Sequence, residues 1–487
     1  MKKLTDILKN TPVREVCGDT AAAIGGLVYD SRAVKPGDCF FAVPGTQSDG
    51  HDYIPMAVEK GAAAIVCERM PADAAEGVAY VLVGDSAGAM AVMAAAFYDY
   101  PSRELKLVGI TGTNGKTTTA TLLYDLVRAM GYKAGLISTV VYKIDGREVE
   151  ATHTTPDSIR LNAMMREMAD AGCAYCFMEC SSHAIVQERT RGLDFAGGIF
   201  SNITHDHLDY HKTFAEYIRA KKLFFDGLPK GAFALTNADD RNGRVMVQNT
   251  AAAVSAYSLR AMADFRCKIV EMHLDGMLLR IDGQELWVGL LGRFNAYNLL
   301  AVYGAAVLLG LDRGEVLRVL SMLHAVSGRF EKIRAANGTT AIVDYAHTPD
   351  ALENVIQTIE EIRTPGQQLI VVCGCGGDRD RTKRPEMAAI AVKYATTAVF
   401  TSDNPRHESP EAILDDMVAG LEPGARYLRI ADRAEAIRTA VMLSRPGDII
   451  LVAGKGHETY QIVGDVKHPF DDREEINSQF RIQNSKL

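Results

Sequence analysis

The sequence predicts an α/β protein in which parallel sheets are covered by helices. Short apolar runs alternate with helical segments through most of the 487 residues, which is the pattern of βαβ units. Domains commonly span roughly 100–200 residues, so a chain of this length is expected to form about three. A Gly-rich turn between a strand and a helix near residue 112 resembles the loops that surround phosphate groups.

The composition is that of an ordinary globular protein. Apolar residues make up 47% and charged residues 23%, and the net charge of −8 is spread without long runs, which argues against a nucleic-acid-binding surface. No apolar run approaches the ~18 residues of a membrane span. The start, MKKLTDILKN, lacks the apolar core of a signal peptide, and the nine cysteines fit reduced thiols, so a cytoplasmic protein without membrane insertion is expected.

Residues 1–100 are expected to form the first domain. Apolar runs such as AAAIVCE and YVLVG alternate with Gly- and Asp-rich turns, and an Ala-rich helix is predicted over Ala87–Tyr98. Pro101 lies in the segment YPSR and discourages helix continuation, which indicates a linker.

The second domain is predicted over residues 101–328. It begins with a strand at Leu105–Ile110, a Gly-rich turn and a helix that ends near Gly131, and a further helix is expected at Leu161–Ala171. The third domain, 329–487, repeats the alternation and predicts a smaller doubly wound sheet, with a helix from Ala351.

The loop TGTNGKTT is expected to bind the phosphates of a nucleotide. Its residues are Gly112, Thr113, Asn114, Gly115, Lys116, Thr117 and Thr118. Glycines let backbone N–H groups face phosphate oxygens, Lys116 neutralises β/γ-phosphate charge, and the Thr117 hydroxyl can ligate Mg²⁺. Ile110 departs from the usual glycine at the first motif position, so a plain Gly-rich turn with a surface lysine is the alternative.

Two further runs follow strands and carry candidate metal ligands. Glu179 lies in MECSSH, and His205, His207 and His211 lie in SNITHDHLDYH. A carboxylate at a strand end suits Mg²⁺, whereas the histidines, and the cysteines of CAYCFMEC, leave zinc as the less favoured alternative. In the next predicted helix Lys221 shares a face with aromatic Phe214 and Tyr217; from the spacing alone, a lysine with an apolar stem and an exposed amine is the simpler interpretation.

Three strand ends in the last domain are expected to meet at one crevice. They carry the segments CGCGGDRD, SDNPR and AGKGHE, and the candidate residues are Arg379, Asp403, Asn404, Pro405, Arg406, Gly454 and Glu458. Two arginines and a glutamate suit a zwitterion, since arginine binds carboxylates through two hydrogen bonds. The alternatives are a second phosphate loop at Gly376-Gly377 and a surface ion pair between Arg406 and Glu408.

Taken together, these motifs resemble the Mur ligase family over essentially the whole chain. The resemblance implies a three-domain Mur ligase architecture with a central P-loop domain, and an ATP-dependent reaction in which a carboxylate becomes an acyl phosphate that an amine attacks. It also implies Mg²⁺ ligands at Glu179 and His207, and a carbamylated Lys221 (N6-carboxylysine). Asn295 in GRFNAYN matches the element that faces adenine, while Arg329 and Asp344 match nucleotide contacts from the C-terminal domain.

Within that family the chain resembles the branch that adds meso-2,6-diaminopimelate to UDP-N-acetylmuramoyl-L-Ala-D-Glu, a step of peptidoglycan precursor synthesis. GGDRD and DNPR match its diaminopimelate pocket. By the same resemblance the UDP-muramoyl dipeptide is contacted by Ser31, Thr46, Gln47, Ser48, His153, Thr154, Thr155, Ser181, Gln187 and Arg189. Relatives often have Asn at position 153. A monomer is expected, and the alternatives are another superfamily ligase, such as folylpolyglutamate synthetase, or a nucleotide-binding scaffold without catalysis.

Overall fold

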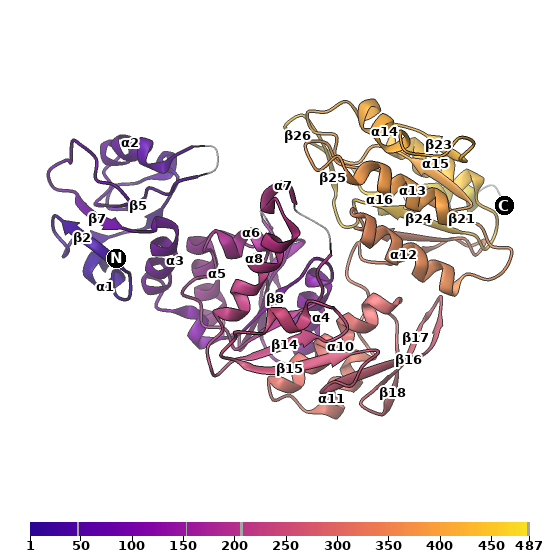
Figure 1. Ribbon diagram of the computed structural model, residues 1–487, viewed down its shortest axis with the longest axis horizontal. Helices are drawn as coiled ribbons and strands as arrows, with labels where there is room; N and C mark the ends of the chain where they lie inside the picture. The colour runs from indigo at the N-terminus through magenta and orange to yellow at the C-terminus, as the bar shows by residue number, and fades with distance from the viewer. Residues whose placement is uncertain (46–47, 152, 205–207, 485–487) are drawn as a thin grey trace.

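Three sheets follow one another along the chain, and each forms the centre of its own lobe. The computed structural model describes residues 1–45, 48–151, 153–204 and 208–484, without the side chains of residues 208, 209 and 484. The N-terminal lobe lies at one end of an elongated molecule, the central lobe in the middle and the C-terminal lobe at the other end (Figure 1).

The N-terminal lobe contains a five-stranded sheet in the order β2-β7-β6-β5-β4. Its strands are β2 (Val13–Cys17), β4 (Leu27–Val28), β5 (Cys39–Phe41), β6 (Ala64–Cys67) and β7 (Ala79–Val83), and its longest helix is α3 (Ser86–Phe97). Neighbours from β4 to β7 are parallel, and β2 pairs antiparallel at the edge. The lobe joins the central one where α3 packs against α5 (Ser158–Asp170).

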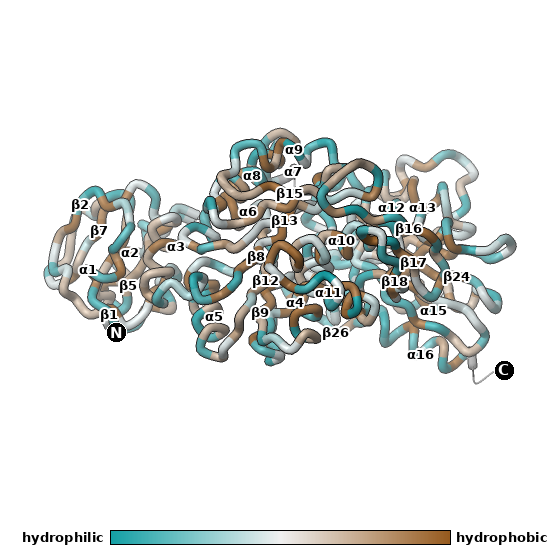
Figure 2. Tube along the Cα trace, turned by 90° about the horizontal axis from the view of Figure 1, so that it is seen from below, coloured by the Kyte–Doolittle hydropathy of each residue, from teal (hydrophilic) through white to brown (hydrophobic). Residues whose placement is uncertain are grey.

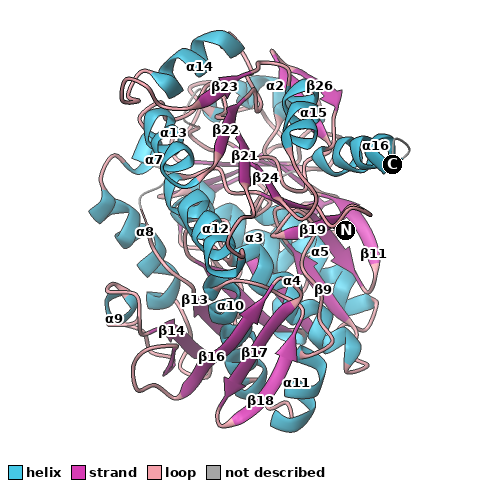
Figure 3. Cartoon of the chain, turned by 90° about the vertical axis from the view of Figure 1, so that its right-hand side faces the viewer, coloured by secondary structure: helices cyan, strands magenta, loops and turns pink. Residues whose placement is uncertain are grey.

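The central lobe contains an eleven-stranded sheet in the order β11-β10-β9-β12-β8-β13-β14-β15-β16-β17-β18. Its strands are β8 (Lys106–Thr111), β9 (Ala134–Ile137), β10 (Val141–Ile144), β11 (Arg147–Glu150), β12 (Tyr175–Glu179), β13 (Gly197–Phe200), β14 (Phe233–Asn237), β15 (Ala253–Ser258), β16 (Phe265–His273), β17 (Gly276–Ile281) and β18 (Gln284–Val288). The middle of the sheet is parallel, and antiparallel strands extend both edges; Figure 3 shows β16, β17 and β18 at the end away from β21 to β24.

Helices cover both faces of the central sheet. They are α4 (Lys116–Ala129), α5, α6 (Ser182–Val186), α7 (Leu208–His211), α8 (Phe214–Asp226), α9 (Gly243–Met246), α10 (Arg293–Leu308) and α11 (Arg313–Leu320). Two apolar clusters flank the sheet, one with α4 and α10 and the other with α5 and α8. Figure 2 shows hydrophobic residues gathered near β8 and β13.

The C-terminal lobe contains a six-stranded sheet in the order β19-β20-β24-β21-β22-β23. The strands are β19 (Glu331–Arg334), β20 (Thr340–Asp344), β21 (Leu369–Cys373), β22 (Thr397–Phe400), β23 (Tyr427–Arg429) and β24 (Ile449–Ala453), followed by the hairpin β25 (Tyr460–Val463) and β26 (Val466–Pro469). Its helices are α12 (Pro349–Ile362), α13 (Lys383–Tyr394), α14 (Pro410–Val418), α15 (Arg433–Leu443) and α16 (Asp472–Asn484). All neighbours except β19 are parallel, so the prediction of a doubly wound sheet is confirmed.

Several helices begin earlier than the apolar pattern predicts, because a polar residue caps the first turn. Asp157 accepts a hydrogen bond from the backbone of Arg160 and starts α5, three residues before the predicted Leu161. Thr348 in the same way starts α12 at Pro349 rather than at Ala351. A proline is tolerated in a first helical turn, where its missing N–H has no partner to lose.

Among the described residues, no helix combines the length and the apolarity that crossing a membrane requires.

Candidate active site between the central and C-terminal lobes

The phosphate loop has the geometry that its glycines predict. At Gly112, which follows β8 with φ +148°, a Cβ atom would lie 2.0 Å from the Ser201 hydroxyl; at Gly115, with φ +87°, it would lie 2.5 Å from the Asn298 amide oxygen. The backbone N–H of Thr113 donates to the carbonyl of Asn202 at 2.8 Å. The loop is therefore held tightly against the segment after β13. Helix α4 begins at Lys116, within the loop, so the N-terminus of the helix points into the phosphate loop.

The cationic side chains of this loop region lie close to backbone oxygens and to the C-terminal lobe. Lys116 Nζ donates to the carbonyl oxygens of Gly112 at 2.9 Å and Thr113 at 2.8 Å. Arg329, from the start of the C-terminal lobe, donates to the Thr117 hydroxyl at 3.3 Å. A charge from each lobe is thus available at the loop.

Glu179 and Lys221 are both buried in the central lobe. Glu179 ends β12; one of its carboxylate oxygens accepts from the backbone N–H of Thr139 at 2.7 Å, and the other has no hydrogen-bond partner among the described residues. Lys221 in α8 is 1% exposed, and its Nζ donates to the carbonyl of Gly112 at 2.7 Å and lies 4.6 Å from the centre of the Tyr217 ring. The interpretation of Lys221 as a surface lysine with an exposed amine is therefore wrong.

These donors fit a hard divalent cation. The carboxylate oxygen of Glu179 that has no hydrogen-bond partner among the described residues is the kind of oxygen ligand that Mg²⁺ prefers, and the buried Thr117 hydroxyl of the phosphate loop is another. Within the described residues, no three His, Cys, Asp or Glu side chains group as a metal site. His207, the other predicted ligand, lies outside the described residues.

A cavity of about 410 Å³ opens between the phosphate loop and the C-terminal lobe. Of the predicted nucleotide residues, its lining includes Asn114, Gly115, Thr118, Arg329 and Asp344. Asn295 lies beneath the wall instead: its amide donates to the carbonyl of Leu291 at 2.7 Å and accepts from Asn298, which does line the cavity. Asn295 thereby orients Asn298, which the sequence analysis did not select although it is the second Asn of the same motif.

Asp344 and Arg329 form the C-terminal wall of that cavity. The Asp344 carboxylate, at the end of β20, accepts from the backbone N–H of Phe330 at 2.7 Å. Burial raises the pKa of Asp344 to about 6, although the nearby Arg329 guanidinium acts in the opposite direction. Arg329 stacks over the Tyr345 ring at 4.6 Å.

Four of the residues predicted to contact the UDP-muramoyl dipeptide form one hydrogen-bonded group in the central lobe: Thr155, Ser181, Gln187 and Arg189. The Thr155 hydroxyl donates to the Glu179 carbonyl at 2.7 Å and accepts from the backbone of Ser181 at 3.2 Å. Arg189 donates to the Thr155 carbonyl at 2.6 Å and to the Gln187 side chain at 2.5 Å. The hydrogen-bonded group is therefore attached to the backbone of the buried Glu179.

The remaining residues of that prediction are more widely distributed. The backbone of His153 is held by the Tyr142 hydroxyl, and the Thr154 hydroxyl accepts from that of Thr139 at 3.1 Å. Ser31 is buried and Ser48 exposed in the N-terminal lobe, and neither lines the two cavities described here. Thr46 and Gln47 lie outside the described residues.

A second cavity, of about 570 Å³, lies where β21, β22 and β24 end. Of the predicted amino-acid residues, its lining includes Arg379, Asp403, Asn404, Arg406, Gly454 and Glu458, and Pro405 is absent from it. Lys455, which the sequence analysis did not select, is fully buried and donates to Glu458 at 2.8 Å and to the Asn404 side chain at 3.2 Å. Its place between two glycines after a buried strand was the available signal.

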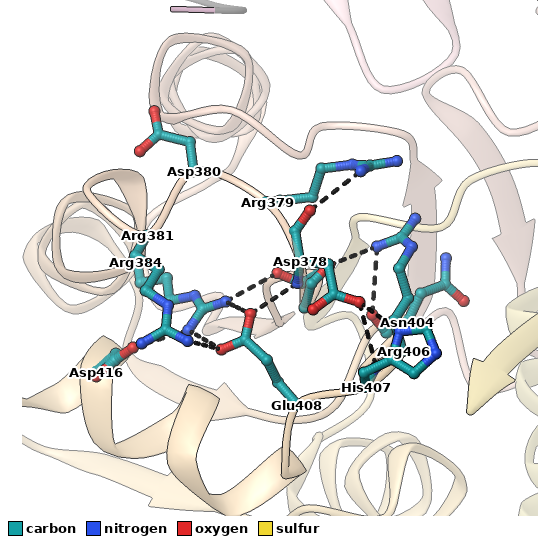
Figure 4. Close-up of polar contacts among 12 residues, drawn as sticks. Asp378, Arg379, Asp380, Arg381, Arg384, Asn404, Arg406, His407, Glu408 and Asp416 are labelled. Atoms are coloured by element: carbon teal, nitrogen blue, oxygen red, sulfur yellow. Dashed lines mark hydrogen bonds and ion pairs between the residues drawn. The ribbon is translucent and has the colours of Figure 1, made fainter. Parts of the chain in front are cut away.

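Figure 4 shows the loops that carry the two arginines of this cavity. Arg406 donates to the carbonyl of Gly377 at 2.9 Å, whereas Glu408 is bound by Arg384 and Arg381. The alternative of an Arg406–Glu408 surface pair is therefore wrong. A Cβ atom at Gly377 would lie 1.9 Å from the Pro405 carbonyl oxygen, so that glycine serves the close approach of two loops.

The two cavities share part of their lining. Tyr345, His347 and Asp350 line both, and Thr154 and His183 of the central lobe reach the second. The Asp350 carboxylate accepts from the Asn114 side chain at 2.9 Å, which joins the start of α12 to the phosphate loop. No motif in the sequence marks Asp350; its only signal is its place in the first turn of a Thr-capped helix.

The central lobe carries a phosphate loop and a buried carboxylate, and the C-terminal lobe carries an arginine-lined cavity. Together they define a class of nucleotide-dependent enzymes with a second site suited to a zwitterion. Family models describe the same three regions: the Mur ligase family catalytic domain matches residues 23–98, the Mur ligase middle domain 110–306, and the Mur ligase glutamate ligase domain 328–456. The chain belongs to the Mur ligase family.

Individual relatives cover the whole chain. The UDP-N-acetylmuramoyl-L-alanyl-D-glutamate–2,6-diaminopimelate ligase of Phocaeicola vulgatus is 55% identical over 480 residues, 98% of this chain and 99% of its own. The ligase of the same description from Chlorobaculum tepidum is 44% identical over 477 residues, 95% of this chain and 94% of its own. A solved structure of such a ligase superimposes with a TM-score of 0.71 at 32% identity, covering 99% of both chains.

Proposed function

We propose that this Mur ligase adds meso-2,6-diaminopimelate to UDP-N-acetylmuramoyl-L-Ala-D-Glu, with conversion of ATP to ADP and phosphate. The enzyme is an amide-forming ligase of peptidoglycan synthesis. The observation that carries the substrate assignment is the shared wall: a nucleotide-sized cavity at the phosphate loop and an arginine-lined cavity meet at Tyr345, His347 and Asp350. Relatives of up to 55% identity over nearly the whole chain carry the same activity in their names.

The first step is transfer of the γ-phosphoryl group of ATP to the D-Glu γ-carboxylate. A carboxylate oxygen attacks phosphorus, the bond to the β-phosphate oxygen breaks, and ADP leaves. Lys116, at the phosphate loop, neutralises the charge that this transfer develops, and Arg329 adds a second positive charge from the other lobe. Asp344 and Asn298 line the cavity in which we place the nucleoside.

Thr117 and Glu179, with His207, would hold Mg²⁺ at this point. An ion bound there would supply positive charge to the phosphate oxygens. Lys221 lies beside the same loop, and its carbamylated form would supply an anionic oxygen pair where the amine now contacts Gly112.

The second step joins the amino acid. Its neutral amine attacks the acyl carbon, the tetrahedral intermediate expels phosphate, and an amide remains. We place the amino acid in the cavity of about 570 Å³, with Arg379 and Arg406 facing its carboxylates and Glu458 its distal ammonium. Thr154 and His183 of the central lobe line this cavity and do not line the nucleotide cavity. An amino acid bound here therefore has its amine on the side of the residues to which we assign the dipeptide.

The same proposal includes a role for each domain, a cellular location and an oligomeric state. We assign residues 1–100 to UDP binding, 101–328 to ATP binding and 329–487 to amino-acid binding. The pair of substrates that it joins belongs to precursor synthesis, and we place the enzyme in the cytoplasm as a monomer.

The test is phosphate release from ATP with purified protein. Phosphate should appear only when UDP-N-acetylmuramoyl-L-Ala-D-Glu and meso-diaminopimelate are both present, and the product should carry both by mass. Activity with tetrahydrofolate and glutamate in their place would favour a folylpolyglutamate synthetase, and nucleotide binding without turnover would favour a scaffold. Lys116→Ala should release no phosphate while still binding the UDP substrate; turnover within about threefold of wild type would contradict the role of the loop lysine.

A further inference from the structure

Behind the arginine-lined cavity lies a cluster of charges around a buried arginine, and this cluster does not line the cavity. Arg384, in the first turn of α13, is fully buried. Its guanidinium binds both carboxylate oxygens of Glu408 at 2.9 and 3.0 Å and the Asp416 carboxylate at 2.7 Å. None of these three residues lines the cavity.

This cluster joins the two loops that carry the cavity arginines. Arg384 also donates to the carbonyl of Gly376 at 3.2 Å, and Glu408 accepts from the backbone N–H of Asp378 at 2.6 Å. Glu408 lies two residues after Arg406, and Asp378 directly precedes Arg379. The Arg384–Glu408 pair therefore contacts the backbone of the loop that precedes Arg379, while Glu408 itself belongs to the loop of Arg406. Figure 4 shows the pair on the opposite side of the loops from the two cavity guanidinium groups.

Both arginines need such support. Asp378 and Arg406 have φ of +52°, in the left-handed region that a residue with a side chain adopts only when its surroundings hold it. Burial lowers the pKa of Arg406, and the neighbouring positive Arg379 lowers it further, so the two guanidinium groups repel each other. Arg384 in turn holds the pKa of Glu408 near 2, so the carboxylate stays ionised at neutral pH.

We propose that Arg384 and Glu408 are positioning residues that set the spacing between Arg379 and Arg406, and thereby the preference for an amino acid with two carboxylates. The inference rests on the proposed function. Neither residue touches the substrate; both act through the loop backbones. Removing the charge of Glu408 should let the loops move apart and weaken only the interaction that needs both arginines.

The test compares kcat/KM for meso-diaminopimelate and for L-lysine, which lacks the second carboxylate. In Glu408→Gln we expect the KM for diaminopimelate to rise about tenfold, with kcat and the lysine reaction within about twofold of wild type, as loss of one well-placed charge-assisted contact predicts. The preference for diaminopimelate should fall accordingly. In an Arg406→Ala background the same substitution should change the preference little, because its target is gone.

Glu360→Gln is the matched control. Glu360 forms an ion pair with Arg363 at 2.9 Å in α12 and lines neither cavity, so the variant should keep the wild-type preference. A Glu408→Gln enzyme that loses thermal stability and loses both reactions by the same factor would reduce the pair to a structural role and overturn the inference.

Asp416→Asn serves if Glu408→Gln does not fold. The Asp416 side chain is 42% exposed, and its carboxylate accepts at 2.7 Å from the same Arg384 nitrogen that donates to Glu408. Its loss should loosen the Arg384–Glu408 pair and lower the preference by about two- to threefold; an unchanged preference would overturn the inference. A wild-type enzyme that does not use diaminopimelate would refute the proposed function itself, which separates the two failures.

Discussion

Lys221 is a buried lysine beside a phosphate loop, and its chemistry can be tested directly. Its Nζ lies 2.7 Å from the carbonyl oxygen of Gly112 and 4.6 Å from the centre of the Tyr217 ring, beside the loop at which a carbamate would add two anionic oxygens. We expect Lys221→Ala to be inactive and to be partly rescued by short carboxylates, which replace the carbamate oxygens. Mass spectrometry of the native enzyme at mild pH should show the added CO₂; a fully active enzyme without it would contradict the modification.

Arg406 is the residue on which amino-acid selection depends. Each charge-assisted hydrogen bond to the distal carboxylate contributes roughly 1.5–3 kcal/mol, and a bidentate contact has two. The wild-type enzyme should therefore prefer diaminopimelate over lysine by about two to four orders of magnitude, at 1.4 kcal/mol per decade. Competition between the two amino acids measures this preference, and Arg406→Ala should lose most of it. Equal use of both by the wild type would refute the specificity while leaving the ligase assignment intact.

At the scale of elements, the end of β20 introduces a pH dependence. Burial raises the pKa of Asp344 from 3.8 to about 6, so the folded protein binds this proton more tightly than the unfolded chain does. The contribution of Asp344 to stability is thus most favourable below pH 4 and declines as pH rises to about 6, above which it is constant.

The same titration should govern nucleotide binding. If the ionised Asp344 accepts hydrogen bonds from the nucleotide, the dissociation constant for ATP should rise as pH falls through about 6. Titration of ATP binding against pH measures this effect. Asp344→Asn should bind ATP more weakly at pH 7.5 and lose the dependence near pH 6; the same pH profile in both proteins would exclude Asp344 as its source.

Local sequence signals predicted most of the elements and many of the residues that line the two cavities of the candidate site. Apolar runs that end in Glu179, Asp344 or Cys373 predicted strand ends, because a parallel sheet places ligands there. The apolar pattern alone does not mark where α5 and α12 begin, because Asp157 and Thr348 cap these helices before the first apolar residue of each pattern.

Contacts between distant segments could not be predicted from such signals. The pairing of Glu408 with Arg384, of Lys455 with Glu458 and of Asp350 with Asn114 depends on how loops and lobes meet. The burial of a side chain could not be predicted from local signals either. From its spacing along the helix alone, Lys221 was indistinguishable from a surface lysine.

At the scale of the whole molecule, the central and C-terminal lobes join at Gly328. Gly328 has φ +66°, and a Cβ atom there would lie 2.0 Å from the backbone nitrogen of His457. Gly328→Ala should therefore displace the His457 loop, destabilise the enzyme by more than the ~1–2 kcal/mol cost of the left-handed backbone, and lower activity.

Gly338→Ala is the matched control for that substitution. Gly338 has φ +88° in the turn between β19 and β20, where a Cβ atom would have 3.8 Å of space. Gly338→Ala should therefore lower the free energy of unfolding only by the cost of the left-handed backbone, without a steric clash. Chemical unfolding of both variants compares them, and equal losses of stability would show that the contact between Gly328 and His457 does not constrain the junction.

The central claim is that this fold activates a carboxylate with ATP and transfers it to an amine. The most direct measurement uses UDP-N-acetylmuramoyl-L-Ala-D-Glu labelled with ¹⁸O in the γ-carboxylate, together with ATP and meso-diaminopimelate. An acyl-phosphate route transfers one labelled oxygen to the released phosphate for each tripeptide formed, because the carboxylate oxygen that attacks phosphorus leaves with it. Mass spectrometry of the phosphate should therefore show one ¹⁸O per turnover, whereas amide product with unlabelled phosphate would contradict the account.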